Sequence, residues 1–141
     1  PAESILDPFM VHALIKQEST YQLNTVSPVG AVGLMQIMPF TANDVARVLK
    51  LPKPNPEDLF KPELNIKLGV QFMEEVFRKF NRNMIYSVAS YNAGPQRVLT
   101  WSRAPNAADP DLFIEEIPFS ETKNYVKRVL TNYWIYRALY T

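Results

Sequence analysis

The chain has 141 residues, 47% of them hydrophobic and 12% aromatic, which predicts one compact core and excludes a disordered chain. Fifteen basic and fourteen acidic residues leave a formal charge of +1, so we do not expect nucleic acid as a partner. No apolar run approaches the roughly 20 residues of a membrane-spanning helix, and the absence of cysteine excludes disulfides and thiolate metal sites.

The first predicted helix carries the first candidate for chemistry. Asp7 followed by Pro8 is a good helix start, because an aspartate can cap free N–H groups and proline fits the first turn. We expect this helix to run to about Ser19, with Glu18 on its apolar side, one turn beyond Leu14. The apolar neighbourhood and the negative end of the helix dipole would both raise the pKa of Glu18. A protonated carboxyl group can donate its proton to a glycosidic oxygen.

The alternative for Glu18 is a solvated glutamate at a helix end, since most acidic residues are exposed. Glycosidases usually pair their acid with a second carboxylate, although some use the substrate's own acetamido group instead. Asp44, Glu63 and Glu121 could supply that carboxylate, and each could equally be a capping or surface residue. The single histidine, His12, lies on a different face of the first helix, and we expect neither a metal site nor a cofactor.

The rest of the chain is also predicted to be helical. Residues 20–39 are expected to form a structured loop with one short helical turn, and residues 51–56 a proline-rich surface connector. Further helices are expected over residues 39–50, 62–80 and 84–92, after the Gly94-Pro95 turn through Trp101, and from Ser120 toward Tyr140. The last of these should bury Val126, Val129, Leu130, Tyr133 and Trp134. No window alternates as a strand would, so the predicted fold class is all-α.

Two short motifs could contact a sugar. The run 33–36, Gly-Leu-Met-Gln, places the amide of Gln36 after a flexible turn, where it could hydrogen-bond an acetamido group or a hydroxyl. The run 91–94, Tyr-Asn-Ala-Gly, ends a helix with an aromatic ring and an amide. A packing turn and a plain helix terminus are the alternatives without a binding role.

Together these segments resemble the lytic transglycosylases of the soluble (Slt) type, whose catalytic domain is similar to goose-type lysozyme. The resemblance covers nearly the whole chain. It rests on Glu18-Ser19, on Gly33 to Pro39 with Thr41-Ala42, on Tyr91 to Gly94, and on Ile117-Pro118, Glu121-Thr122 and Tyr125-Val126. It implies a compact, lysozyme-like helical fold in which residues 1–141 form one catalytic domain of a longer protein.

The resemblance also implies an enzyme that cleaves the glycan strands of bacterial peptidoglycan. Glu18 would protonate the oxygen between N-acetylmuramic acid and N-acetylglucosamine, and the muramic acetamido carbonyl would stabilise the positive centre. Glu18 would then take the proton of the muramic 6-hydroxyl as that group closes a 1,6-anhydro ring, without water or a second carboxylate. The implied substrate-binding residues are Ser19, Ser27, Gln36, Tyr91, Asn92, Glu121 and Tyr125.

Two positions depart from the family pattern and concern the shape of the cleft: Ser90 stands where many members have alanine, and Val32 where a small or hydroxyl residue is common. A lysozyme-like hydrolase and a non-catalytic peptidoglycan-binding module remain alternatives, whereas a plain helical interaction domain would leave the motifs unexplained. From the family we expect a monomer in the periplasm or cell envelope, with association to the outer membrane left open.

Overall fold

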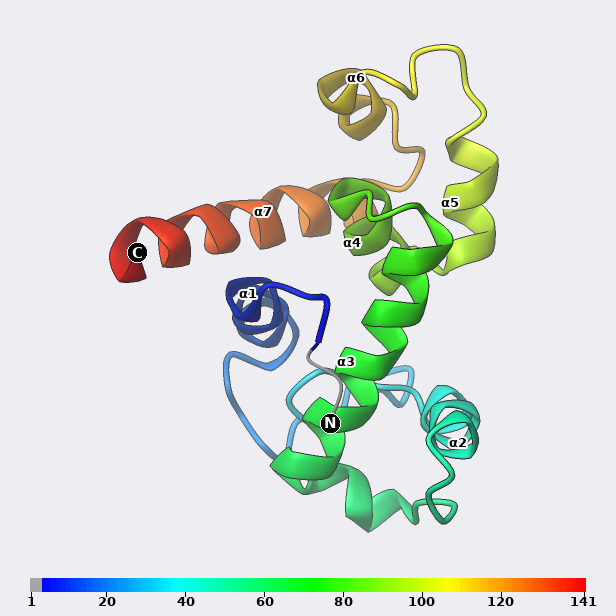
Figure 1. Ribbon diagram of the computed structural model, residues 1–141, viewed down its shortest axis with the longest axis vertical. Helices are drawn as coiled ribbons and strands as arrows, with labels where there is room; N and C mark the ends of the chain where they lie inside the picture. Colours follow the sequence, from blue (N-terminus) through cyan, green and yellow to red (C-terminus); the bar gives the residue numbers. More distant parts are fainter. Residues whose placement is uncertain (1–3) are drawn as a thin grey trace. The chain divides into compact units, whose positions relative to one another are not determined.

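The computed structural model describes residues 4–141 and forms α-helices without a strand in that range (Figure 1). The elements are α1 (Pro8–Ser19), α2 (Pro39–Val48), the 3-10 helix η1 (Pro56–Phe60), α3 (Pro62–Lys79), α4 (Met84–Ala93), α5 (Pro95–Trp101), α6 (Pro110–Glu115) and α7 (Ser120–Tyr140). The predicted all-α class is therefore confirmed. Within these residues no helix combines the length and apolar character that a membrane crossing requires.

Residue contacts divide the chain into two compact units, Pro1–Glu74 and Glu75–Thr141. The first holds α1, α2, η1 and most of α3, and the second holds α4 to α7 with the end of α3. The boundary falls inside α3, so one continuous helix contributes residues to both units.

Helix boundaries follow the capping signals of the sequence. The Asp7 carboxylate accepts a hydrogen bond from the N–H of Phe9 at 2.9 Å, directly ahead of the proline that opens α1. The Asn83 side chain caps α4 in the same way, accepting from the N–H of Tyr86 at 3.0 Å. Gly94 separates α4 from α5 at φ 92°, a conformation that favours glycine. These starts and stops agree with the predicted ones.

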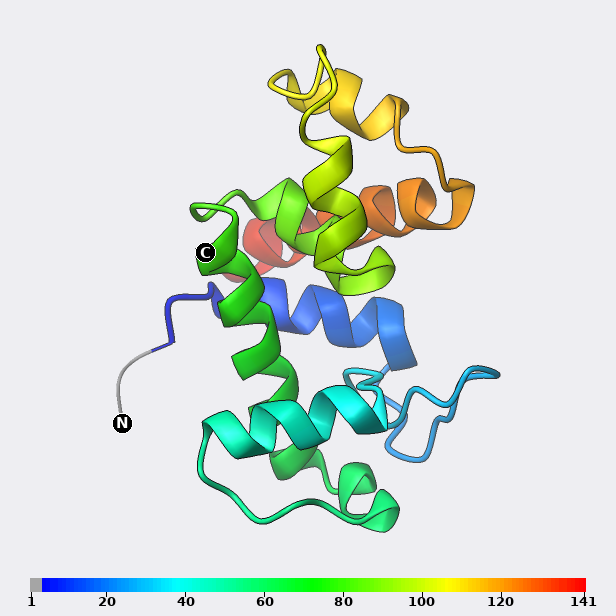
Figure 2. The same cartoon turned by 90° about the vertical axis from the view of Figure 1, so that its right-hand side faces the viewer.

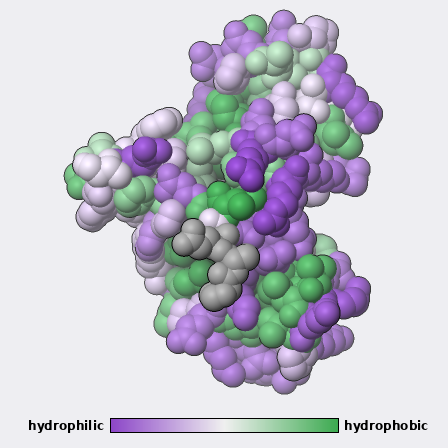
Figure 3. All heavy atoms as spheres, in the orientation of Figure 1, coloured by the Kyte–Doolittle hydropathy of each residue, from purple (hydrophilic) through white to green (hydrophobic). Residues whose placement is uncertain are grey.

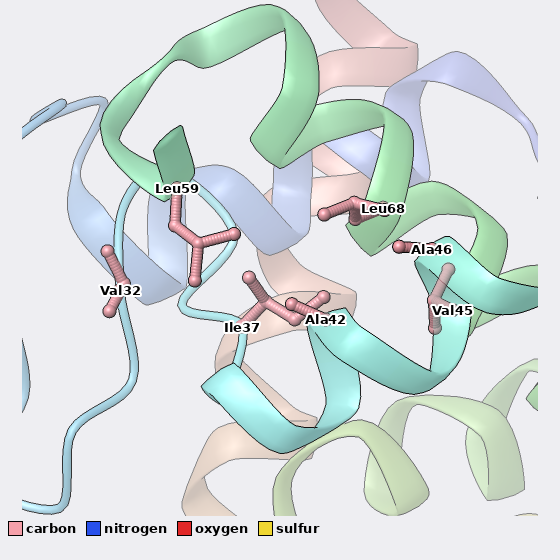
Figure 4. Packing of buried hydrophobic residues seen from close by; sticks show 7 residues of the cluster. All are labelled: Val32, Ile37, Ala42, Val45, Ala46, Leu59 and Leu68. Atoms are coloured by element: carbon pink, nitrogen blue, oxygen red, sulfur yellow. The ribbon is translucent and has the colours of Figure 1, made fainter. Parts of the chain in front are cut away.

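The core of the first unit joins buried side chains from four segments of the chain (Figure 4). None of the cluster is more than 6% exposed. Its members are Val32 and Ile37 before α2, Ala42, Val45 and Ala46 on α2, Leu59 on η1 and Leu68 on α3. Leu59 therefore anchors an element that the sequence did not predict, directly after the proline-rich connector.

The element η1 is also held by a charged side chain at its start. The Asp58 carboxylate accepts a hydrogen bond from the N–H of Asn55 at 2.9 Å and lies 3.1 Å from the Lys61 ammonium. The bond from Asn55, and then the Lys61 ammonium, lower the pKa of Asp58 below its ordinary value. Local polar contacts thus fix this short element in addition to the burial of Leu59.

The segment between α1 and α2 contains turns and two isolated antiparallel bridges, and no helical turn, so that detail of the prediction was wrong (Figure 2). Val32 and Ile37 exchange two backbone hydrogen bonds, of 3.0 and 3.1 Å. This pairing closes the 33–36 run into a tight turn, because its two flanking residues lie opposite each other. Val32 also bridges to Val26, which ties the turn to the earlier part of the segment.

The C-terminal part of α7 leaves several apolar side chains exposed. Val126, Val129 and Tyr133 are buried as predicted, but Trp134 is 60% exposed and so does not belong to the core. Ile135, Leu139 and Tyr140 are also exposed, and Figure 3 shows pale and green side chains at the C-terminal end of α7. An apolar pattern indicates which side chains favour burial, but it does not show where the neighbouring helices end.

Candidate functional site

The residues predicted for the site fall into two groups, one in each compact unit. The first group is Glu18, Ser19, Ser27 and Gln36, and the second is Tyr91, Asn92, Glu121 and Tyr125. Each group has a geometry of its own.

Glu18 lies in the last turn of α1, on the side of the helix that is buried. Leu14 and Ile15, one turn earlier, are 0% and 3% exposed, and Glu18 itself is partly buried. Thr20 ends the helix in the left-handed conformation at φ 53°, with its N–H donating to the carbonyl of Lys16 at 3.1 Å. The Glu18 carboxyl group is thus carried at the carbonyl end of a helix, beside apolar residues.

The side chains of Ser19 and Tyr21 both hydrogen-bond to backbone carbonyls of α1. The Ser19 hydroxyl is buried and donates to the carbonyl of Ile15 at 3.1 Å, so it can offer a ligand only its lone pairs. Tyr21 is also left-handed, at φ 63°, and its hydroxyl donates to the carbonyl of His12 at 3.3 Å and lies 3.1 Å from His12 Nδ1. These contacts fix how the chain leaves the helix that carries Glu18.

Asn65 on α3 holds the 33–36 turn from within the first unit. It is fully buried; its Oδ1 accepts from the N–H of Met35, and its Nδ2 donates to the carbonyls of Val32 and Leu59, each at 2.8 Å. Gly33 has φ 77°, and a Cβ there would lie 2.4 Å from Asn65 Nδ2, so glycine is required on both counts. Asn65 was not predicted as a site residue, because one asparagine in a helical pattern does not reveal its partners.

The amide of Gln36 is oriented by the same turn. Gln36 has φ 50°, an uncommon value outside glycine, and its Nε2 donates to the carbonyls of Thr25 and Gly33 at 3.0 and 2.9 Å. Both amide protons are engaged, and within residues 4–141 Oε1 has no hydrogen bond, so Gln36 can act toward a ligand only as an acceptor. Ser27 is engaged locally, since its Oγ accepts from the N–H of Ala31 at 3.0 Å.

The second group is assembled by α4 and α7. Tyr91 and Asn92 are near the end of α4 and are partly buried, while Glu121 is exposed in the first turn of α7 and Tyr125 is 5% exposed. The hydroxyl of Thr122, which is buried, donates to Asn92 Oδ1 at 2.7 Å. This bond connects α4 and α7 at the point where both helices carry residues predicted for the site. Thr122 itself was not predicted to have a role.

The other carboxylates considered for the chemistry are exposed. Asp44 lies 3.5 Å from Arg47 on α2 with 69% of its side chain exposed, and Glu63 and Glu121 are exposed in the first turns of their helices. Glu18 differs from all three in being partly buried. Across the part of the chain that the structure describes, no three histidine, aspartate or glutamate side chains gather as a metal ion would require.

A pocket of about 380 Å³ in the second unit contains none of the residues predicted to react with or bind the substrate, although Ile117 and Pro118 of the motif residues line it. Its wall includes Trp101, Arg103, Phe113 and Glu116, from α5 to just beyond α6. The lining of this pocket is mostly apolar, and Glu116 is its one acidic residue. None of the eight residues of the two groups lines this pocket.

Comparison with known proteins places these motifs in a family. Residues 2–114 match the model of the transglycosylase SLT domain, and residues 116–141 match that of the soluble lytic transglycosylase helical domain. The soluble lytic murein transglycosylase of Escherichia coli (strain K12) is 45% identical over 127 residues, which cover 89% of this chain and 20% of that protein. The chain thus spans about a fifth of the length of this relative.

Solved structures give the same result for the fold. The structure of the 70-kDa soluble lytic transglycosylase of Escherichia coli aligns with this chain with a TM-score of 0.89 and 41% sequence identity. The alignment covers 96% of this chain and 22% of the Escherichia coli chain. A second structure is that of an inactive mutant of the lytic transglycosylase Slt of Pseudomonas aeruginosa, in which glutamine replaces one glutamate. It aligns with this chain with a TM-score of 0.88 and 39% sequence identity, and the alignment covers 93% of this chain and 21% of the Pseudomonas aeruginosa chain. These matches confirm the predicted lysozyme-like helical fold.

Proposed function

Because the chain belongs to the transglycosylase SLT domain family, we propose that it is a peptidoglycan lytic transglycosylase that cleaves the β-1,4 bond between N-acetylmuramic acid and N-acetylglucosamine without water. The observation that carries the proposal is the position of Glu18, partly buried at the carbonyl end of α1, while Asp44, Glu63 and Glu121 are exposed. A single carboxyl group in such surroundings is suited to donate a proton.

The proposed reaction uses Glu18 twice. Its protonated carboxyl group gives a proton to the glycosidic oxygen as the bond to muramic C1 breaks, and the acetamido carbonyl of the same sugar stabilises the positive charge at C1. The Glu18 carboxylate then accepts the proton of the muramic 6-hydroxyl while that oxygen bonds to C1. The products are a 1,6-anhydromuramic end and a free N-acetylglucosamine hydroxyl, and Glu18 is again protonated.

Two findings support one glutamate as the acid and base. The Pseudomonas aeruginosa relative is inactive when glutamine replaces one glutamate. In this chain, the alternative carboxylates lie on helix surfaces, and Asp44 is already close to a cation. A substrate acetamido group removes the need for any of them, because its carbonyl oxygen can donate an electron pair to the positive C1, as a second carboxylate does in other glycosidases.

The remaining predicted residues would bind and orient the glycan. Gln36 would accept a hydrogen bond from an acetamido N–H or a hydroxyl, because both of its own amide protons are engaged. Tyr91 offers an aromatic face to a sugar ring, and Asn92 offers an amide. We assign binding roles also to Ser19, Ser27, Glu121 and Tyr125.

We propose further that these 141 residues act as one catalytic domain within a longer protein, since the Escherichia coli relative is about five times as long. The substrate places the enzyme in the periplasm or cell envelope of a bacterium, and we propose that it acts there as a monomer.

The test is mass spectrometry of the soluble products after incubation of purified peptidoglycan with the chain or with Glu18→Gln. We expect 1,6-anhydro products from the parent and at least a roughly thousandfold lower rate from Glu18→Gln, since proton transfer is lost in both steps. The variant should fold normally, because glutamine has nearly the same shape.

Asp44→Asn and Glu63→Gln are the matched controls and should keep most of the parental rate. Loss of activity in either variant without unfolding would instead indicate a two-carboxylate hydrolase. Hydrated reducing ends would assign the chain to the lysozyme-like hydrolases, and binding of peptidoglycan without any soluble product would make it a binding module.

A further inference from the structure

Thr122 and Asn92 form a buried contact between α4 and α7 that the proposed function does not use. Thr122 is 1% exposed, and its Oγ1 donates to Asn92 Oδ1 at 2.7 Å, a normal length for a hydroxyl donor. Within residues 4–141 this is the one hydrogen bond of either side chain. The orientation of the Asn92 amide therefore depends on Thr122.

The burial of the hydroxyl fixes the direction of this bond. If the Asn92 amide were flipped, its Nδ2 would donate to Thr122 Oγ1, and the hydroxyl proton would then have no acceptor in a buried position. A buried donor without a partner is costly, so the arrangement with Oδ1 toward Thr122 is favoured. Both protons on Asn92 Nδ2 then remain for a ligand, because Asn92 is only partly buried.

We propose that Thr122 is a positioning residue for the reaction, which holds the Asn92 amide so that Nδ2 is presented to the glycan as a hydrogen-bond donor. The inference rests on the proposed function, which assigns Asn92 to substrate binding. Nδ2 would recognise an acceptor, namely a carbonyl or hydroxyl oxygen of the sugar. The polarity is opposite to that of Gln36, whose donors are engaged and whose Oε1 remains for a ligand.

The matched pair of variants is Thr122→Val, which keeps the shape without the hydroxyl, and Thr122→Ser, which keeps the hydroxyl. With solubilised glycan strands from peptidoglycan as substrate, we expect Thr122→Val to lower kcat about tenfold with a smaller change in KM, because a misoriented amide positions the reacting sugar poorly. Thr122→Ser should restore kcat to within about twofold of the parent.

A double-mutant cycle separates positioning from a merely structural role. In an Asn92→Ala background, Thr122→Val should have little further effect on kcat, because the group through which Thr122 acts is gone. An equal loss in both backgrounds, or parental activity in Thr122→Val, would overturn the proposal. If Thr122→Val does not fold, Thr122→Ala compared with Thr122→Ser makes the same distinction.

A second measurement does not depend on activity. In the 15N-labelled chain, the side-chain NH2 signals of Asn92 should shift or broaden in Thr122→Val, as the amide samples both orientations, and should return in Thr122→Ser. Unchanged signals in Thr122→Val would overturn the proposal even in an active enzyme. An inactive parent that still shows the shift and its rescue would instead overturn the proposed function and leave the contact as an orienting device for a binding site.

Discussion

Ser90 is a buried polar residue with an unsatisfied hydroxyl. It is 0% exposed on α4, and its Oγ makes no hydrogen bond with any residue that the structure describes. Ser87, one turn earlier and equally buried, differs because its Oγ donates to the carbonyl of Asn83 at 2.7 Å. A hydroxyl taken out of water without a partner destabilises the folded state. Ser90 is also the position where the family pattern favours alanine.

We therefore expect Ser90→Ala to raise the free energy of unfolding by about 1 kcal/mol, since the unpaired hydroxyl is removed and alanine favours the helix. Urea denaturation followed by circular dichroism measures the change. Ser87→Ala is the control, and it should be neutral or destabilising because its hydroxyl is hydrogen-bonded. A Ser90→Ala variant no more stable than the parent would mean that the hydroxyl is satisfied in solution.

The turn at residues 33–36 shows how an element can depend on one side chain from another helix. Asn65→Ala would remove the partner of the Met35 N–H and of the Leu59 carbonyl in a buried position, and one of the two hydrogen bonds to the Val32 carbonyl, which also accepts from the N–H of Ile37. We expect a loss of about 3 kcal/mol in the free energy of unfolding. Asn124→Ala, at an exposed position of α7, should change it by less than about 0.5 kcal/mol. Similar effects for the two variants in urea denaturation would contradict this account.

Most helices could be predicted from the sequence, but the two shortest could not. η1 has five residues and α6 has six, too few for a helical period to be recognised. A usable signal was nevertheless present, since Asn55-Pro56 and Asp109-Pro110 repeat the cap and proline that correctly predicted the start of α1. Capping residues thus carry information about short helices that periodicity does not.

At the scale of the whole molecule, the motifs identify the residues proposed for the site, but they do not identify what holds them. Glu18, Gln36 and Asn92 belong to recognisable runs of sequence, whereas Asn65 and Thr122 act through contacts between residues 30 or more positions apart. Which residues meet in such contacts depends on how the helices pack, and a single sequence does not show this packing.

The continuity of α3 across both units has a consequence for how the chain can be cut. A protease needs a locally extended, exposed stretch, and the boundary between Glu74 and Glu75 is inside a helix. Limited proteolysis followed by mass spectrometry should therefore first cleave exposed turns such as residues 103–106, leaving two fragments that stay associated in the folded protein. Early fragments that end near residue 74 would mean that α3 opens before the turns do. A truncation at that boundary would leave each half with a severed helix end.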